Sequence, residues 1–295
     1  MGRTASYKAD SRLHVGPEMN LMSDATLRLH EKGDEGARKA DAMMNSNTKP
    51  MLKFEGVGFE YDGRAIMRDV SFAVGKGEMV ALLGPSGCGK TTILNIVAGF
   101  LNPTNGVAFV NDKEIAGPGP DRGVVFQAAA LFDWMTVADN ISFSLRCSGR
   151  PKAERRKVAE EMAQLVGLSG FEDAYPYQLS GGMRQRVGLA RVLAAKPKVM
   201  LMDEPFSALD VQTREVLQEE VIRICEQTGC TILFVTHSID EAVFLGDRIF
   251  LLTDLSGGSF DEFAVNLPSP RANGENRLHP EFLRLRELIY RKMRH

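Results

Sequence analysis

The chain contains 295 residues, of which 44% are hydrophobic and 25% are charged, and its formal net charge is −2. This composition is ordinary for a globular protein with one large domain or two small ones, and the low net charge excludes bulk electrostatic attraction to nucleic acid or to an anionic membrane. No apolar run is long enough to cross a bilayer and the N-terminus lacks the pattern of a secretory signal, so neither a membrane span nor export is expected.

The first part of the chain, residues 1–50, is polar and lacks sustained periodicity, so it is predicted to be a disordered N-terminal extension. From Met51 onward, short apolar runs separated by glycine turns predict strands and helices. We expect strands at Leu52–Phe59, Ser71–Val74, Met79–Leu83, Val107–Val110 and Val124–Phe126, and a helix at Thr91–Ala98 that ends at Gly99.

The segment between Gln127 and Ser180 has a helical pattern, most clearly at Lys152–Leu165. Strands return afterwards at Val199–Met202, Thr231–Val235 and Arg248–Leu252, with a helix at Val211–Glu226. This alternation predicts an α/β fold with a mainly parallel sheet, into which a helical subdomain of about residues 128–180 is inserted.

A C-terminal tail, residues 266–295, follows the last of these strands. Prolines at Pro268 and Pro270 interrupt regular structure, and a basic amphipathic helix is expected at Phe282–Met293. Its apolar stripe consists of Phe282, Leu285, Leu288 and Ile289. Packing against its own domain is the favoured interpretation, and contact with a membrane or a partner is the alternative.

A glycine-rich loop lies between the predicted strand Met79–Leu83 and the predicted helix at Thr91. It fits the pattern G-x-x-x-x-G-K-[ST], in which glycines let successive backbone N–H groups face a phosphate. We expect Lys90 to reach the β- and γ-phosphates of ATP, Thr91 to bind Mg²⁺ and Thr92 to support the phosphates. The predicted nucleotide-binding residues of this loop are Gly84, Pro85, Ser86, Gly87, Cys88, Gly89, Lys90, Thr91 and Thr92.

Two adjacent carboxylates end the apolar strand at Val199–Met202. Asp203 is placed to hold Mg²⁺ through water, and Glu204 to act as a general base on the attacking water. The alternative is a pair of solvated acids that begin a loop.

A second phosphate-binding motif is predicted far downstream, at Leu179–Arg186. Ser180, Gly181 and Gly182 lead into a helix, so that exposed N–H groups and the positive end of the helix dipole form a seat for an anion. The chain contains residues for only one ATP pocket. The second motif therefore indicates a dimer, in which the motif of each subunit contacts the nucleotide bound by the other.

These motifs, with Gln127, the segment 207–210 and His237, occur in the order found in ATP-binding-cassette (ABC) ATPases, and the chain resembles that family from about Met51 to Leu252. The resemblance implies an ABC ATPase domain, residues 51–265, with a P-loop NTPase core and a small antiparallel β subdomain. Gln127 would sense Mg²⁺ and the attacking water.

The resemblance also implies the remaining site residues. Tyr61 would stack on adenine and His237 would contact the γ-phosphate, although a strand-end tyrosine and a surface histidine are the plain alternatives. Ser180 and Gly182 would contact the γ-phosphate bound by the partner subunit, and Asp210 would lie at the dimer seam.

Among ABC proteins, the chain resembles a transporter subunit. DNA-repair relatives insert a long coiled coil, whereas only about fifty residues separate Gln127 from Ser180. The segment Ala130–Val137 contains Phe132 and Trp134, which either form a groove for a helix of a membrane subunit or belong to the core of the helical subdomain.

Residues 131–137, 175–180 and the tail resemble the nitrate/sulfonate/taurine group of importers. This resemblance implies an ATP-hydrolysing subunit, with ATP and Mg²⁺, that forms a homodimer at the cytoplasmic face of the inner membrane as a peripheral protein. Its partners would be separate permease subunits and an extracytoplasmic solute-binding protein, with no nucleic acid. The alternatives are the ATPase subunit of an exporter of lipid or another solute, and a soluble ABC ATPase without a transport role.

Overall fold

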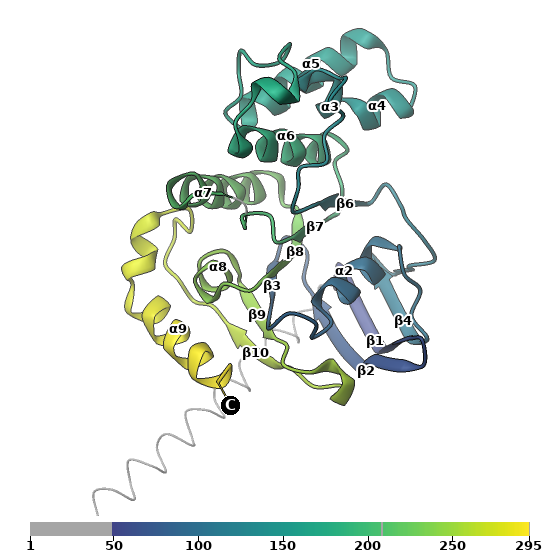
Figure 1. Ribbon diagram of the computed structural model, residues 1–295, viewed down its shortest axis with the longest axis vertical. Helices are drawn as coiled ribbons and strands as arrows, with labels where there is room; N and C mark the ends of the chain where they lie inside the picture. Colours follow the sequence, from purple (N-terminus) through teal and green to yellow (C-terminus); the bar gives the residue numbers. More distant parts are fainter. Residues whose placement is uncertain (1–48, 208, 295) are drawn as a thin grey trace, which may run out of the picture. The chain divides into compact units, whose positions relative to one another are not determined.

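Two β-sheets form the frame of the protein, and the computed structural model describes residues 49–207 and 209–294 (Figure 1). The larger sheet has the strand order β10-β9-β3-β8-β7-β6, and the smaller has the order β2-β1-β4-β5. The predicted disorder of residues 1–50 falls mainly on residues 1–48, which lie outside the described residues.

The larger sheet is parallel except at one edge. Its strands are β3 (Met79–Leu83), β6 (Arg122–Val125), β7 (Val199–Asp203), β8 (Thr231–Thr236), β9 (Arg248–Leu251) and β10 (Asp261–Ala264), of which only β10 pairs in the antiparallel sense. β3 and β8 are buried along their whole length. Burial on both faces accounts for the continuous apolar runs in these strands, and the predicted mainly parallel sheet is confirmed.

The two faces of the larger sheet pack into separate cores. Along β3, Val80 and Leu82 join the core beneath the smaller sheet, whereas Ala81 and Leu83 face the opposite core. Helix α2 (Lys90–Ala98) contributes to the first core, while α7 (Val211–Thr228) and α8 (Ile239–Leu245) contribute to the second. Helices therefore cover one face of the sheet, and α2 and the smaller sheet cover the other.

The smaller sheet is antiparallel and consists of β1 (Leu52–Tyr61), β2 (Arg64–Val74), β4 (Asn105–Val110) and β5 (Lys113–Glu114). Phe72 connects it to the larger sheet, because its ring lies 4.5 Å from that of Phe54 in β1 and 5.2 Å from that of Phe250 in β9. The predicted strand Ser71–Val74 is only the last part of β2, which begins seven residues earlier, at Arg64.

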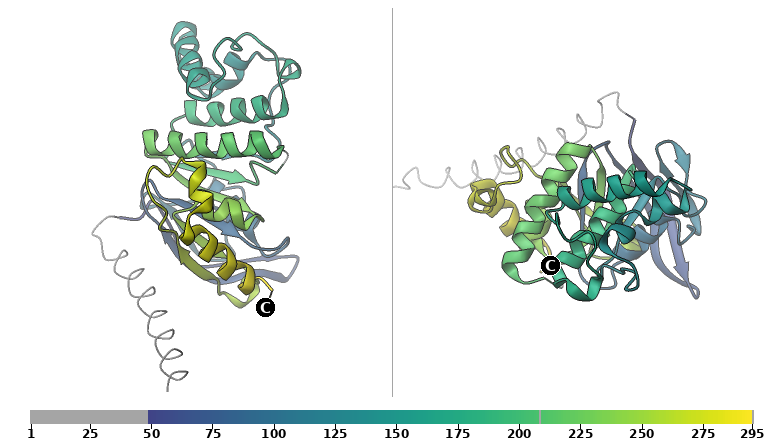
Figure 2. Two further views of the ribbon diagram at one scale, coloured as in Figure 1. Left: turned by 90° about the vertical axis from the view of Figure 1, so that its left-hand side faces the viewer. Right: turned by 90° about the horizontal axis from the view of Figure 1, so that it is seen from above.

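The helical subdomain contains α3 (Val137–Ile141), α4 (Phe143–Cys147), α5 (Lys152–Leu165), the 3₁₀ turn η1 (Pro176–Gln178) and α6 (Gly181–Ala194). Figure 1 and the left-hand view of Figure 2 show α6 between α7 and the other helices of this subdomain. Asn140 is fully buried, and its amide holds the preceding loop by donating to the carbonyls of Phe132, Met135 and Thr136 at 3.0–3.1 Å.

The C-terminal tail contains η3 (Gly274–Leu278) and α9 (Pro280–Lys292), after the short turn η2 (Leu255–Gly257). Phe282, Leu285 and Ile289 are buried in the second core, so packing against the own domain is confirmed for this helix. Leu288 was wrongly included in the stripe, because it is exposed to 36%.

Candidate active site

The phosphate loop joins β3 to α2, as the sequence predicts. Lys90 is the first residue of α2 and is buried, with its Nζ donating hydrogen bonds to the carbonyls of Gly84 at 2.8 Å and Pro85 at 2.7 Å. These two bonds hold the ammonium group against the backbone of the phosphate loop.

Two glycines of this loop meet specific steric demands. Gly89 has a φ of 102°, which other residues rarely adopt. A Cβ on Gly84 would lie 2.1 Å from the carbonyl oxygen of Leu252, so the loop can approach the end of β9 only without a side chain. The spacing of glycines in the motif therefore reflects the curl of the loop and its contact with a neighbouring strand.

A pocket of about 460 Å³ opens beside the phosphate loop. Tyr61, which is 64% exposed, and Glu204 are both among its lining residues. Its lining combines apolar residues of the smaller sheet with the polar loop: Phe59, Tyr61, Ile66, Ser86, Gly87, Gly89, Lys90, Thr91, Thr92, Leu101 and Glu204. A lining with both aromatic and phosphate-loop residues suits a nucleotide, which has a flat base and charged phosphates.

Asp203 and Glu204 lie at the carboxyl end of β7. Burial raises the pKa of the Asp203 carboxyl, and the neighbouring charge of Glu204 raises it further, while Lys90 acts in the opposite direction. Glu204 has a φ of 43°, and its N–H donates to the carbonyl of Val235 at 3.1 Å. This strained backbone turns the Glu204 side chain away from the direction of the strand, toward the pocket.

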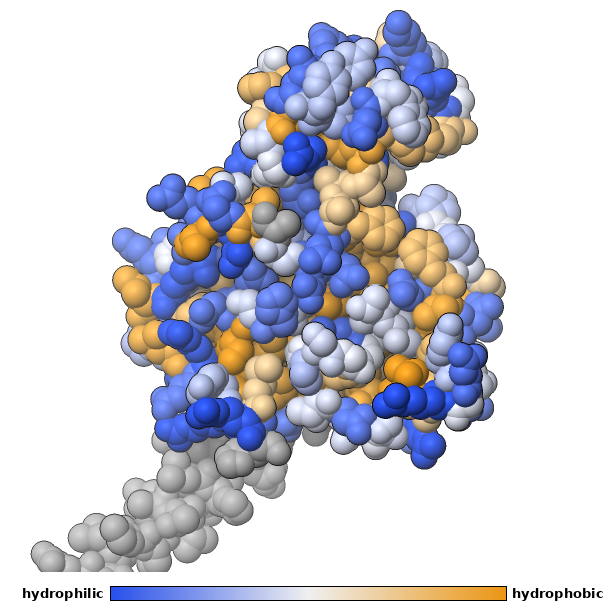
Figure 3. Space-filling view, viewed as in Figure 1, coloured by the Kyte–Doolittle hydropathy of each residue, from blue (hydrophilic) through white to orange (hydrophobic). Residues whose placement is uncertain are grey.

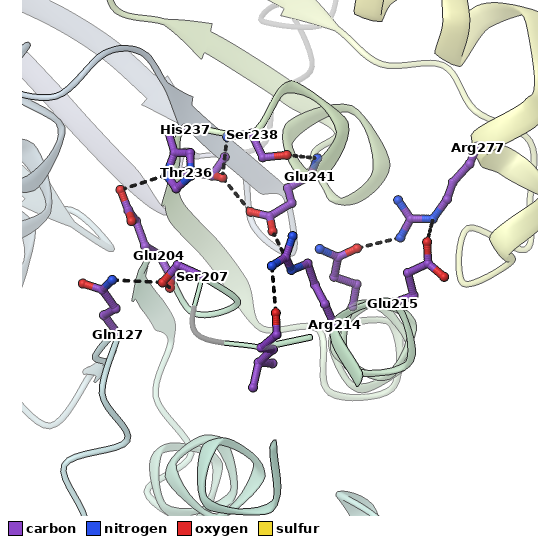
Figure 4. A network of polar contacts seen from close by, with 12 residues as sticks. Gln127, Glu204, Ser207, Arg214, Glu215, Thr236, His237, Ser238, Glu241 and Arg277 are labelled. Atoms are coloured by element: carbon purple, nitrogen blue, oxygen red, sulfur yellow. Dashed lines mark hydrogen bonds and ion pairs between the residues drawn. The ribbon is translucent and has the colours of Figure 1, made fainter. Parts of the chain in front are cut away.

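Glu204 and three further residues, from three separate segments of the chain, form one polar cluster (Figure 4). Glu204 Oε1 lies 3.3 Å from Nδ1 of His237, which directly follows β8. Gln127 Nε2 donates to Ser207 Oγ at 3.0 Å, and that hydroxyl donates to the carbonyl of Glu204 at 2.9 Å. The structure thus brings together all three residues that sequence analysis assigned to catalysis.

Ser207 is the residue of this cluster to which sequence analysis gave no role. It connects Gln127 to the backbone of Glu204 by the two hydrogen bonds described above. The signal in the sequence was its place in the segment 207–210, three residues after Glu204. The amide orientation follows from this bond and directs the Gln127 carbonyl oxygen away from Ser207 (Figure 4).

The predicted second phosphate-binding motif lies at the start of α6. Ser180 is exposed and caps the helix, with its Oγ accepting from the N–H of Met183 at 3.3 Å. Among the described residues, none of Ser180, Gly181 and Gly182 lines the pocket beside the phosphate loop. Asp210 caps α7, and its hydrogen bond from the Thr213 N–H lowers the pKa of its carboxyl.

Comparison with known proteins identifies the family. The family model described as ABC transporter matches residues 67–207. The uncharacterized ABC transporter ATP-binding protein MJ0412 of Methanocaldococcus jannaschii is 47% identical over 263 residues, which cover 88% of this chain and 95% of that protein. The taurine import ATP-binding protein TauB of Yersinia pseudotuberculosis is 44% identical over 247 residues, which cover 82% of this chain and 97% of TauB. The chain belongs to the ABC transporter ATP-binding family.

Solved ABC ATPases share its fold. The dimeric structure of a post-hydrolysis state of the cassette MJ0796, bound to ADP and Pi, has a TM-score of 0.63 and 32% identity, and covers 73% of this chain and 99% of that one. CbiO1 of Clostridium perfringens, part of the transporter complex cbiONQ, has a TM-score of 0.69 and 26% identity, and covers 82% and 98%. The predicted P-loop fold and the ATPase activity are thereby confirmed.

The ABC ATPase has donors of the kind that Mg²⁺ prefers near its phosphate loop. Thr91, which carries a hydroxyl, lines the pocket, the Asp203 carboxylate ends β7, and the Gln127 carbonyl oxygen is oriented away from Ser207. These hard oxygen donors fit Mg²⁺, which also keeps several waters and binds substrate phosphates. The metal roles of Thr91, Asp203 and Gln127 stay predictions.

Aromatic side chains are exposed on the helical subdomain of the ABC ATPase. Trp134 is 74% exposed, so the interpretation that it belongs to the core is wrong, whereas Phe132 is half-buried against Phe143. Tyr175 and Tyr177 stack at 5.7 Å. A hydrogen bond connects the segment that contains Trp134 to the segment that contains Tyr175 and Tyr177, because the Val137 N–H donates to the Ala174 carbonyl at 2.8 Å. Apolar residues also gather beneath this subdomain in the space-filling view (Figure 3).

Proposed function

We propose that the chain is the ATP-hydrolysing subunit of an ABC importer and that two copies close around ATP. The observation that supports closure is the separation of two predicted phosphate-binding elements within one chain, because Ser180–Gly182 do not line the pocket beside the phosphate loop. A twofold dimer would place the signature of each copy over the pocket of the other. The dimeric structure of MJ0796 supports this arrangement.

In the proposed mechanism, Lys90 exchanges its two loop carbonyls for phosphate oxygens, and Tyr61 stacks on adenine. Glu204 takes a proton from water as the water oxygen bonds to the γ-phosphorus, and the bond to the β-phosphate oxygen breaks to release ADP. His237 and Gln127 orient the γ-phosphate and the water. Mg²⁺, held by Thr91, Asp203 and Gln127, supplies positive charge to the phosphates when bound.

Substitutions in the pocket test this mechanism. Glu204→Gln keeps the size of the side chain but removes its basicity, so turnover should fall by about 10²–10⁴-fold with ATP affinity retained. Lys90→Ala should weaken ATP binding itself. We would measure ATP affinity by calorimetry and turnover by phosphate release. Turnover near that of the wild type in Glu204→Gln would remove Glu204 from the base role.

Dimer closure is tested separately by light scattering of Glu204→Gln. Added ATP should convert monomer to dimer because bound nucleotide bridges the two halves. A Ser180→Arg substitution places a bulky side chain at the exposed start of α6 and should prevent the dimer while leaving ATP binding to the monomer intact. A monomer that persists with ATP in Glu204→Gln would contradict closure.

We further propose that the importer carries a small sulfonate of the taurine type, which TauB relatives at 44–47% identity support. The aromatic segments around Trp134 and Tyr177 would receive a helix of separate permease subunits at the cytoplasmic face of the membrane, and an extracytoplasmic solute-binding protein would deliver the solute. No described helix is long and apolar enough to span a bilayer.

Uptake of labelled taurine in the source organism tests the solute. Deletion of the gene should abolish uptake, and only the wild-type gene should restore it, with Glu204→Gln as the inactive control. Normal taurine uptake in the deletion strain, together with lost uptake of an alkanesulfonate or nitrate, would reassign the solute within the importer group.

A further inference from the structure

A buried carboxylate, that of Glu241, lies beside Thr236, the residue that precedes His237 (Figure 4). Its Oε2 accepts a hydrogen bond from Thr236 Oγ1 at 2.6 Å, and Thr236 directly precedes His237. The same Thr236 oxygen accepts from the N–H of Ser238 at 3.0 Å. Glu241 therefore fixes the chain on both sides of His237 through a single hydroxyl.

Arg214 of α7 lies near the other carboxylate oxygen of Glu241, the one that does not bond to Thr236. Its Nη2 donates to the carbonyl of Leu209 at 2.8 Å, within the segment that runs from Ser207 to Asp210. Its Nε lies 3.9 Å from Glu241 Oε1. Glu241 and Arg214 together thus connect the histidine loop to the segment that bonds to Gln127 and to the backbone of Glu204.

The distance between these two charges allows movement. Arg214 Nε is buried and has no hydrogen-bond partner among the described residues. A charge-assisted hydrogen bond is about 1 Å shorter than the observed 3.9 Å. Arg214 lies in α7 and Glu241 in α8, so a small shift of either helix toward the other would give this nitrogen its missing bond. The positions of the two helices, and of the residues that each side chain bonds to, are therefore coupled in energy.

Other charged groups near Glu241 and Arg214 have polar partners of their own. Arg277 of η3 donates from Nη2 to Gln218 Oε1 at 2.6 Å, and its Nε lies 3.9 Å from Glu215 (Figure 4). Asp240, next to Glu241 in the chain, pairs with Arg286 of α9 at 3.1 Å. Arg214 is the cation that contacts both Glu241 and the segment after Glu204.

We propose that Glu241 is a positioning residue for ATP hydrolysis. Through Thr236 and Arg214 it makes the loop of His237 and the residues Ser207 and Leu209 adopt the hydrolytic arrangement together. Glu241 itself is not among the residues that line the pocket beside the phosphate loop. This role rests on the hydrolytic site proposed above.

The test uses the full-length protein and separates turnover from binding. Glu241→Gln keeps an acceptor for the Thr236 hydroxyl but removes the charge that faces Arg214, and Arg214→Met removes the cation. Each should lower kcat about tenfold while the KM for ATP changes less than about twofold. The double variant should also lose about tenfold, because both substitutions break one connection, whereas independent effects would multiply to about a hundredfold.

Thr236 provides a rescue experiment within the same connection. Thr236→Val removes the hydroxyl and should lower kcat about tenfold, whereas Thr236→Ser restores it and should keep kcat near that of the wild type. A merely space-filling role for Thr236 would instead favour Val over Ser.

Arg271→Met is the matched control for the loss of a buried arginine. Arg271 also has a buried Nε without a partner among the described residues, and donates to the carbonyls of Phe244 and Gly246 at the other end of α8. Arg271→Met should lower the thermal unfolding midpoint and leave kcat unchanged. Unchanged kcat in Glu241→Gln, a multiplied loss in the double variant, or an equal kcat loss in Arg271→Met would overturn the proposal. If the wild type hydrolyses ATP and Glu204→Gln does not, the hydrolytic site stands in any of these cases.

Discussion

The glycine that ends the phosphate-loop helix should be far more sensitive to substitution than a comparable glycine elsewhere. Gly99 caps α2 with a φ of 79°, and a Cβ there would lie 2.2 Å from backbone atoms of Gly117. Gly229 caps α7 with a φ of 64°, and a Cβ added there would meet no atom within 4 Å. Both positions are left-handed, so only the steric crowding differs.

The cost of each substitution can be worked out from these contacts. Gly229→Ala places a Cβ in the left-handed conformation, which costs about 1–2 kcal/mol. Gly99→Ala carries the same cost and also forces two backbone segments apart, which adds about 1–3 kcal/mol and gives about 2–5 kcal/mol in all. A shift of α2 also moves Lys90 at its first residue, so ATP affinity should fall in Gly99→Ala only.

Urea unfolding and ATP calorimetry on both variants measure these effects. The free energy of unfolding should fall clearly more in Gly99→Ala than in Gly229→Ala. Equal losses would refute the reasoning, because they would mean that the close approach of Gly117 to α2 imposes no constraint.

Three further predictions concern the site and its surface. Asp203→Asn should abolish turnover but raise the thermal midpoint at neutral pH. The pKa of Asp203 is raised in the fold, so stability is lost as pH rises from the ordinary pKa of 3.8 through the folded value, and an amide avoids that loss. Ser207→Ala removes the bonds to Gln127 and to the Glu204 carbonyl and should lower kcat about tenfold at constant ATP affinity, as measured by phosphate release. Trp134→Ala should leave the thermal midpoint and the ATPase activity of the isolated chain unchanged, because the side chain is 74% exposed, but should reduce copurification with the permease.

Contiguous motifs could be located from the sequence because their geometry is local. Residues 84–92 fold as a strand, loop and helix, and the helix at Lys152–Leu165 has the predicted bounds. The early part of β2 was missed because its pairing with β1 is irregular, and Asp69 within it has a φ of 47°. β10 escaped notice because it is a short edge strand with acidic residues.

The contacts between distant segments could not be predicted, because sequence spacing carries no information about them. Gln127 and Ser207 are 80 residues apart in the chain and yet form a hydrogen bond. Arg214 and Glu241 resemble ordinary helix residues in the sequence, and only the packing of α7 beside α8 brings them into one network (Figure 4).

The register of three parallel strands explains why these segments meet. Leu83 at the end of β3 pairs with Thr236 at the end of β8, and Asp203 at the end of β7 pairs with Val235. Three adjacent strands therefore end at the same level. The phosphate loop, His237 and Glu204 follow these strands directly, so they lie together at the carboxyl ends of the strands. Ser180 begins a helix of the inserted subdomain and does not extend from this edge. Strand register thus gathers the predicted hydrolytic groups of one chain, whereas the predicted second phosphate-binding element lies apart from them, as the proposed dimer requires.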